Sequence, residues 1–365
     1  MSRNFASSVC GVLALTATLT MAAEPSALPD YKPAIKVQGT LRSWGNNHMA
    51  VLVKRWETGF RKYHPDIRFE DKLKSTAMAQ WGLHEWAADL AVMGRQIWPY
   101  EFYGSYRRSY LYPVEIAVAT GSYDVPGKSS ALAVFVHKDN PINKLTLQQL
   151  DRIFGAERTG GWQGLDWVKE GVARGPETNI RTWGQLGLTG EWADKPIVPY
   201  GPPSLVTGAI SYFQSRVSGG SDTRNERLRE YDDRQQMAHD LGNDRYGIGY
   251  AGMNDRNAQL KTIALAEREG SPYLLPSKTS VANRTYPLTR TAYIYFTIDT
   301  KTGDVAVPPV DPKVKEFLRY VLSRQGQQEV GRDGGYLPLT PELVRAQLEK
   351  LDNPSTQQFY RKDRR

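Results

Sequence analysis

Residues 131–155, ALAVFVHKDNPINKLTLQQLDRIFG, give the clearest indication of fold class in this chain. The first six of these residues form an apolar run with β-branched side chains, long enough for a buried strand but too short for a helix that packs by itself. The polar turn 138–141 ends the run, and Thr146 with Gln149 forms a capping-box pattern before an apolar helical stripe. The stretch therefore predicts a strand, a turn and a capped amphipathic helix.

Strand and helix patterns alternate on both sides of this stretch. Strands are expected at 35–37, 66–69, 89–92, 197–199 and 286–297, and helices at 49–63, 77–86, 208–217 and from Pro312 onward. This alternation favours βαβ units around mainly parallel sheets, which is the α/β fold class.

The N-terminal segment 1–23 differs from the rest of the chain. Arg3 precedes a short apolar stretch at 9–21, and Ala22-Ala23 offers a small-residue cleavage site, so we interpret the segment as a secretory signal peptide. No later run reaches the ~20 apolar residues that a membrane-spanning helix needs. The single cysteine, Cys10, lies inside this segment, so the mature protein is expected to contain no disulfide. A lipid anchor on Cys10 is the alternative, but it would require the apolar stretch to precede the cysteine.

Charge and motif content argue against several function classes. The formal net charge is +8, yet basic and acidic residues are interleaved, as in 224–230, which indicates a solvated surface and no nucleic-acid partner. The histidines lack metal-ligand spacing, and neither a nucleophile elbow nor a phosphate-binding Walker motif occurs. We expect no cofactor, no metal and no catalysis.

Four short motifs occur in the order that one known family has them. In chain order they are ADLAVMGR at 88–95, the stretch 131–155 quoted above, IGYAG at 248–252 and YLPL at 336–339. Together they resemble the periplasmic solute-binding proteins of phosphate ABC transporters, over roughly residues 35–345. The resemblance implies a periplasmic-binding-protein-like α/β fold of type II, with two lobes joined by two hinge strands and a ligand cleft between them.

The resemblance also implies a division of the chain. The expected parts are a signal peptide 1–23, a leader arm 24–33, a first lobe 34–130 plus 283–350, a second lobe 131–282 and a charged C-terminal tail 351–365. Two crossings between the lobes, near Ala131 and Tyr293, would allow hinge closure around a ligand.

Loops between strand ends and helix starts are the expected ligand site, because helix N-termini there offer free N–H groups. In this chain such loops are expected at 39–43, 74–76 and 201–208. In the family that the chain resembles, these loops hold a tetrahedral oxyanion. Matched residue by residue, the implied ligand contacts are Thr40, Leu41, Ser75, Thr76, Arg95, Thr207 and Gly208. We add Arg42 and Ser204, which lie in the same loops, as further candidate ligand contacts.

The loop at 201–208 departs from the family pattern of an arginine followed by Ser-Gly-Thr. Pro203 has no charge and Ala209 has no hydroxyl. A bidentate arginine–oxyanion contact is roughly twice as strong as a neutral hydrogen bond, so its loss would weaken or redirect binding. Arg42 or Arg95 could compensate. Plain structural interpretations also exist, since Ser and Thr residues cap helices, Arg95 could be a surface residue and the tryptophans could serve in packing.

We therefore predict a monomeric periplasmic protein that binds phosphate or a phosphate-like anion and delivers it to an ABC transporter permease. Because fold does not fix function, the alternative is an envelope interaction protein, or a phosphoester-acting enzyme, on the same fold with an altered oxyanion site.

Overall fold

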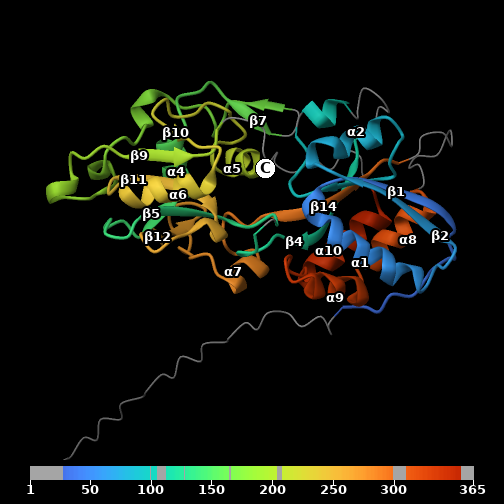
Figure 1. Ribbon diagram of the computed structural model, residues 1–365. Helices are drawn as coiled ribbons and strands as arrows, with labels where there is room; N and C mark the ends of the chain where they lie inside the picture. The colour runs from blue at the N-terminus through green and yellow to red at the C-terminus, as the bar shows by residue number, and fades with distance from the viewer. Residues whose placement is uncertain are drawn as a thin grey trace, which may run out of the picture.

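The computed structural model describes residues 28–98, 100–104, 112–126, 128–163, 166–203, 208–298 and 310–354. The predicted signal peptide, Ser204 and Thr207 lie outside these residues, as does most of the predicted C-terminal tail. Figure 1 shows two lobes side by side, with the chain passing between them through the segments before β5 and before β14.

The first lobe is built on a five-stranded sheet with the order β2-β1-β3-β14-β4. Its strands are β1 (Gly39–Gly45), β2 (Ile67–Leu73), β3 (Leu90–Met93), β4 (Val114–Thr120) and β14 (Thr291–Phe296). Only β14 runs antiparallel to its neighbours within this sheet.

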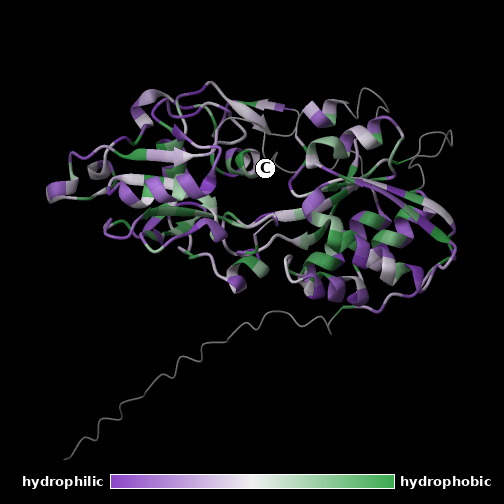
Figure 2. Ribbon diagram, viewed as in Figure 1, coloured by the Kyte–Doolittle hydropathy of each residue, from purple (hydrophilic) through white to green (hydrophobic). Residues whose placement is uncertain are grey.

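Helices cover both faces of this first sheet. The helices are α1 (Ala50–Arg61), α2 (Ala79–His84), α8 (Pro312–Val321), α9 (Arg324–Asp333) and α10 (Pro341–Asp352). In Figure 1, α2 lies on one face and the other four lie on the opposite face. Successive β3 side chains divide between the two layers, with Leu90 and Val92 in the larger core and Ala91 and Met93 under α2. Figure 2 shows the hydrophobic residues gathered where α1, α8 and α10 lie against the sheet.

The second lobe is built on another five-stranded sheet, with the order β10-β9-β11-β5-β12. Its strands are β5 (Leu132–His137), β9 (Val198–Gly201), β10 (Arg229–Glu230), β11 (Gly247–Gly252) and β12 (Leu260–Thr262). Its helices are α4 (Leu147–Phe154), α5 (Gly208–Val217), α6 (Arg234–Asn243) and α7 (Lys278–Ala282). Short pairs add β6 (Lys144–Thr146) with β13 (Ala264–Ala266), and β7 (Gly161–Gln163) with β8 (Asp166–Val168). Only β5 runs antiparallel to its neighbours in the large sheet.

The prediction for residues 131–155 is confirmed. The strand is β5, and Thr146 caps α4 through a capping box in which its Oγ1 accepts from the Gln149 N–H at 3.1 Å. The Gln149 Oε1 accepts in return from the Thr146 N–H at 2.9 Å. The apolar face of α4 is buried against the sheet. The two-lobe α/β expectation is confirmed as well, with mainly parallel sheets.

The expected strand at 35–37 is wrong, and so is the expected loop at 39–43. The strand begins four residues later than expected and runs unbroken through 39–45, paired along its whole length with β2. Burial alternates along the strand, with Leu41, Ser43 and Gly45 facing inward. The segment that joins the sheet is therefore this half-buried strand and not the more apolar run at 35–37.

The described part of the leader arm, 28–33, packs onto the first lobe. Tyr31 is buried, and its hydroxyl donates to Glu316 Oε2 at 2.7 Å while lying 2.7 Å from His64 Nε2. At the other end of the chain, α10 extends to Asp352, so the first residues assigned to the tail are helical.

Glu57 gives the first lobe a pH-dependent stability. Its side chain is fully buried in α1, one carboxyl oxygen accepts from Lys54 Nζ at 2.7 Å, and the other has no partner among the described residues. Burial, and then the neighbouring Asp71, raises the pKa of Glu57 from 4.5 to about 7. Between pH 4.5 and about 7 the carboxyl of Glu57 is therefore protonated in the folded state and ionised in the unfolded state. The free energy of unfolding falls as the pH rises through this range.

We expect Glu57→Gln to remove this loss because glutamine mimics the protonated acid. The variant should match the wild type near pH 4.5 and exceed its unfolding free energy by about 3 kcal/mol at pH 8. Urea denaturation at the two pH values measures the difference. Equal stability of the two proteins at pH 8 would contradict the assignment.

Candidate functional site

A cavity of about 470 Å³ lies between the two lobes. From the first lobe it is lined by residues that follow β1, β2 and β3, namely Asn46–His48, Ser75–Ala77 and Arg95. From the second lobe it is lined by the end of β11 and by residues at the starts of α5 and α6. The carboxyl ends of parallel strands are where open α/β sheets bind ligands, so this is the candidate site.

Asn46 organises the first-lobe wall of the cavity. Its Oδ1 accepts from the His48 N–H at 2.7 Å, and its Nδ2 donates to Thr76 Oγ1 at 2.8 Å. It thereby ties the loop after β1 to the loop after β2, where Ser75 Oγ accepts from the Ala77 N–H at 3.2 Å. The wall thus presents amide, hydroxyl and imidazole groups in fixed positions.

Arg95 follows β3 and is held by an internal carboxylate. Its guanidinium donates to both oxygens of Glu101, at 2.8 and 2.9 Å, and both side chains are about 95% buried. The guanidinium also lies 4.3 Å from the ring centre of Trp98. Arg95 therefore reaches the cavity with most of its charge already balanced.

Arg290 precedes β14 in the segment that returns from the second lobe, and its charge is not balanced. It is 9% exposed, its Nη2 donates to the Gly94 carbonyl at 2.9 Å, and its Nε has no partner among the described residues. No ion pair joins it to any carboxylate in the described part of the chain. Burial lowers the pKa of Arg290 to about 10, with further repulsion from Arg95 and Arg234. A buried cation of this kind is stabilised by an anion placed beside it.

The N-terminus of α5 meets the two arginines. A Cβ added to Gly208, the first residue of α5, would lie 3.1 Å from Arg290 Nη2 and 3.7 Å from Arg95 Cδ. The positive end of the helix dipole and two guanidinium groups therefore converge on one region of the cavity.

Two further cations and a histidine complete the electrostatics of the cavity. Lys128 is paired with Asp333 at 3.0 Å, and Arg234 lies 3.9 Å from the buried Asp255. Burial, followed by repulsion from Arg290, Arg234 and Lys128, lowers the pKa of His48, which is therefore neutral at pH 7. The described lining contains one acid, Asp232, against four cationic side chains. Such a cavity favours an anion.

The structure brings together four of the residues predicted for the site, namely Ser75, Thr76, Arg95 and Gly208. It places the other described three, Thr40, Leu41 and Arg42, inside β1 and away from the cavity lining. Leu41 is fully buried in the hydrophobic core. The physical reason is the length of β1, which moves the loop that faces the cavity to residues 46–48.

The proposed compensation by Arg42 is therefore corrected. Its guanidinium is bound to Asp89 at 2.8 Å and to the Trp86 carbonyl at 2.8 Å. The interpretation of Arg95 as a surface arginine is also wrong, because Arg95 is buried. Trp183 packs in the core as one interpretation held, whereas Trp162 and Trp167 are each 47% exposed and contact each other edge to face.

Sequence reasoning missed Arg290, Asn46, His48 and Lys128. No sequence motif marks Arg290, which lies in the short segment between α7 and β14. Only its burial without a counter-ion among the described residues identifies it as a candidate ligand contact. The loop 46–48 would have been found by placing the end of the first strand at Gly45.

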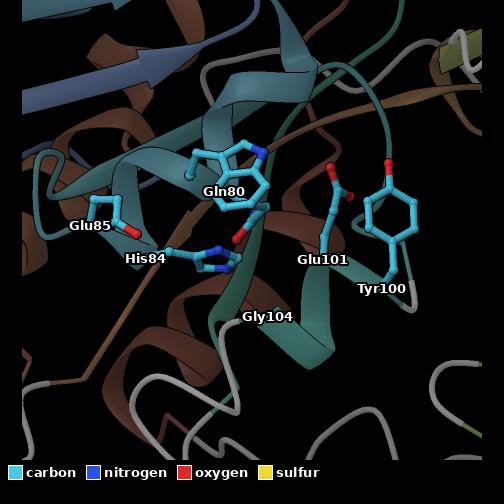
Figure 3. A pocket seen from close by; sticks show the side chains of 7 residues that line it. Gln80, His84, Glu85, Tyr100, Glu101 and Gly104 are labelled. Carbon is cyan, nitrogen blue, oxygen red and sulfur yellow. The ribbon is translucent and has the colours of Figure 1, made fainter.

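A second cavity of about 320 Å³ lies in the first lobe, between α2 and residues 100–104. Figure 3 shows its side chains, which come from α2 and Glu85 on one side and from residues 100–104 on the other. Glu101 lines this second cavity while its partner Arg95 lines the inter-lobe cavity, so their ion pair forms part of the wall between them.

Among the described residues, no group of three or more His, Cys, Asp and Glu side chains is placed to hold a metal ion. In the same ranges, no helix has both the length and the apolar character needed to cross a membrane.

Comparison with known proteins identifies the family. Residues 114–325 match the PBP superfamily domain. The chain is 33% identical over 336 residues to the phosphate-binding protein PstS of Pseudomonas aeruginosa, covering 92% of this chain and 94% of that protein. Among solved structures, PstS from Borrelia burgdorferi has a TM-score of 0.53 at 15% identity, covering 83% of this chain and 100% of that one. An ABC-type phosphate transport receptor from Vibrio cholerae has a TM-score of 0.51 at 17% identity, covering 81% and 99%. The chain belongs to the PBP superfamily and, within it, to the family of the phosphate-binding protein PstS.

Proposed function

We propose that this protein is the periplasmic substrate-binding component of an ABC transporter and that it binds phosphate or a phosphate-like oxyanion between its lobes. The observation that carries the proposal is Arg290, a buried guanidinium without a carboxylate partner among the described residues, at the cavity between the lobes. The P. aeruginosa relative, named a phosphate-binding protein, supports the same ligand class.

The anion would be held from both lobes at once. Arg290 and Arg95 approach from the first-lobe side, while the N-terminus of α5 and Arg234 approach from the second lobe. An anion between them attracts both walls, so it binds the closed arrangement more tightly than the open one and shifts the population toward closure. The hinge consists of the two segments that cross between the lobes, before β5 and before β14.

The remaining parts of the proposal concern location and partners. A signal peptide at residues 1–23 would direct the chain to the periplasm, where the monomeric closed form would dock on an ABC transporter permease and release the anion. Binding without turnover is expected, because the described cavity holds no nucleophile paired with a base and the P. aeruginosa relative is named as a binding protein.

Calorimetric titration of the mature protein, unfolded and refolded to strip any bound ligand, tests the proposal. Phosphate should bind with 1:1 stoichiometry and a Kd on the order of 1 μM or lower, and small-angle scattering should show a smaller radius of gyration in the bound form. If phosphate, sulfate and molybdate all gave no heat and no shift in Tm, the proposal would be abandoned. Stable capture of an envelope protein, or hydrolysis of a phosphomonoester, would then support the alternative functions.

A further inference from the structure

The second cavity, between α2 and residues 100–104, has the opposite charge character to the inter-lobe cavity. Its described lining contains two acids, Glu85 and Glu101, and no lysine or arginine. The described lining of the inter-lobe cavity contains one acid and four cationic side chains. The second cavity, of about 320 Å³, also falls in the range of about 300–1,000 Å³ that is typical of small-molecule sites. Its lining therefore favours a cation.

Gln80 gives the second cavity a buried hydrogen-bond acceptor. The residue is 1% exposed and its Nε2 donates to the Met93 sulfur at 3.1 Å, while its Oε1 has no partner among the described residues. Figure 3 shows Gln80 and His84 on one side of the cavity and Glu101 on the other. A buried acceptor without a donor destabilises the folded protein, so a ligand that brings an N–H group to Gln80 gains free energy there.

Two of the side chains that line the second cavity are exposed aromatic rings. Trp81 is 61% exposed and Tyr100 is 59% exposed. Trp81 contacts His84 edge to face with ring centres 5.6 Å apart, and Tyr100 contacts Trp98 in the same way at 5.3 Å. Aromatic faces attract organic cations, and tryptophan does so most strongly. The two rings therefore offer accessible surface to the organic part of a cation whose charged group lies beside the buried polar residues.

We infer that the second cavity binds a small organic ammonium ion and that its occupancy strengthens anion binding between the lobes. The ammonium group would donate to Gln80 Oε1 and lie beside Glu101 and Glu85. Its organic group would lie against Trp81 and Tyr100. The cation site is independent of the proposed function, and only the coupling between the two cavities rests on it.

The ion pair between Arg95 and Glu101 connects the two cavities. Arg95 lines the inter-lobe cavity and donates to both oxygens of Glu101, which lines the second cavity. An ammonium ion beside Glu101 would share this carboxylate, so less of the charge of Arg95 would be balanced and Arg95 would attract an anion more strongly. The coupling is reciprocal, because an anion must raise the affinity for the ammonium ion by the same factor.

Calorimetric titration of the stripped mature protein with benzylammonium tests the cation site, with benzyl alcohol as a neutral probe of similar shape. Benzylammonium should bind with 1:1 stoichiometry and a Kd on the order of 100 μM, and benzyl alcohol at least about tenfold more weakly because it has no charge. No heat with benzylammonium, or equal affinity of the two probes, would overturn the site.

Phosphate titrations with and without saturating benzylammonium, at matched ionic strength, test the coupling. Benzylammonium should lower the Kd for phosphate about fivefold. An unchanged or higher Kd would overturn the coupling and leave the proposed function intact. Binding of benzylammonium to a protein that binds no phosphate would keep the cation site and overturn the proposed function.

Two variants locate the ammonium ion in the second cavity. Gln80→Leu should weaken benzylammonium binding about tenfold without lowering the Tm of the ligand-free protein, because the acceptor that it removes has no donor among the described residues. Trp81→Ala should weaken the same binding about fivefold. Trp162→Ala is the matched control, since Trp162 is 47% exposed and does not line this cavity. Unchanged affinity in both variants, or an equal loss in the control, would overturn the placement.

Discussion

Replacing Arg290 with glutamine is expected to weaken phosphate binding about 100-fold, because the anion loses a buried, charge-assisted donor. The ligand-free protein should be at least as stable as the wild type. Burial of Arg290 without a carboxylate lowers its pKa to about 10, so its charge destabilises the empty cavity. If the substitution weakens phosphate binding and does not lower the stability of the ligand-free protein, Arg290 serves the ligand and is not merely structural.

Calorimetry and urea denaturation of the Arg290→Gln variant measure the two effects separately. Arg42→Gln is the matched control, since Arg42 is paired with Asp89 and does not line the cavity. We expect the phosphate affinity of that control to stay within about twofold of the wild type, because Arg42 does not reach the cavity. Its stability should fall by no more than about 1 kcal/mol, because a partly exposed ion pair contributes little. Loss of stability without loss of phosphate affinity in Arg290→Gln would show that Arg290 is structural and would contradict the site.

Glu101→Gln is expected to change stability and affinity in opposite directions. Glu101 accepts hydrogen bonds from both terminal nitrogens of Arg95. Removing one partner of a buried ion pair lowers the unfolding free energy by about 3 kcal/mol, because the remaining charge is uncompensated. The same change removes a negative charge beside the cavity and leaves Arg95 free to serve the ligand. Phosphate affinity should therefore rise about tenfold.

The control for this second variant is a similar ion pair elsewhere in the molecule. Asp151 accepts from both terminal nitrogens of Arg158, at 2.7 and 2.8 Å, and it does not line the inter-lobe cavity. Asp151→Asn should destabilise the second lobe and leave phosphate affinity unchanged. If Glu101→Gln behaved in the same way as Asp151→Asn, or if it lowered affinity, Arg95 would not contact the ligand.

Local physics explains which parts of the fold were predictable. The capped helix α4 is specified by Thr146, Gln149 and an apolar stripe within ten residues, and α8 by its Asp311 cap and Pro312. The start of β1 was missed because Ile35–Val37 is the more apolar run. The alternating segment 39–45 becomes a strand through its pairing with β2, which is a contact distant in sequence.

The site was predictable only where a loop motif marks it. Ser75, Thr76 and Gly208 lie at strand-to-helix junctions, which sequence patterns identify. Arg290 lies about 80 residues beyond the loop at 201–208, and nothing around it resembles a ligand-binding motif. Its role follows from the fold, which buries it between the lobes and gives it no carboxylate partner among the described residues.

A crystal structure of the stripped protein with arsenate, located by its anomalous scattering, tests most directly whether the anion site is centred on Arg290. Arsenate has the shape and charge of phosphate and provides an unambiguous peak. The predicted result is one arsenic site between the lobes, with arsenate oxygens about 2.7–3.1 Å from the Arg290 guanidinium and from the first N–H groups of α5. An arsenic site elsewhere on the protein, with the inter-lobe cavity free of arsenic, would contradict this account.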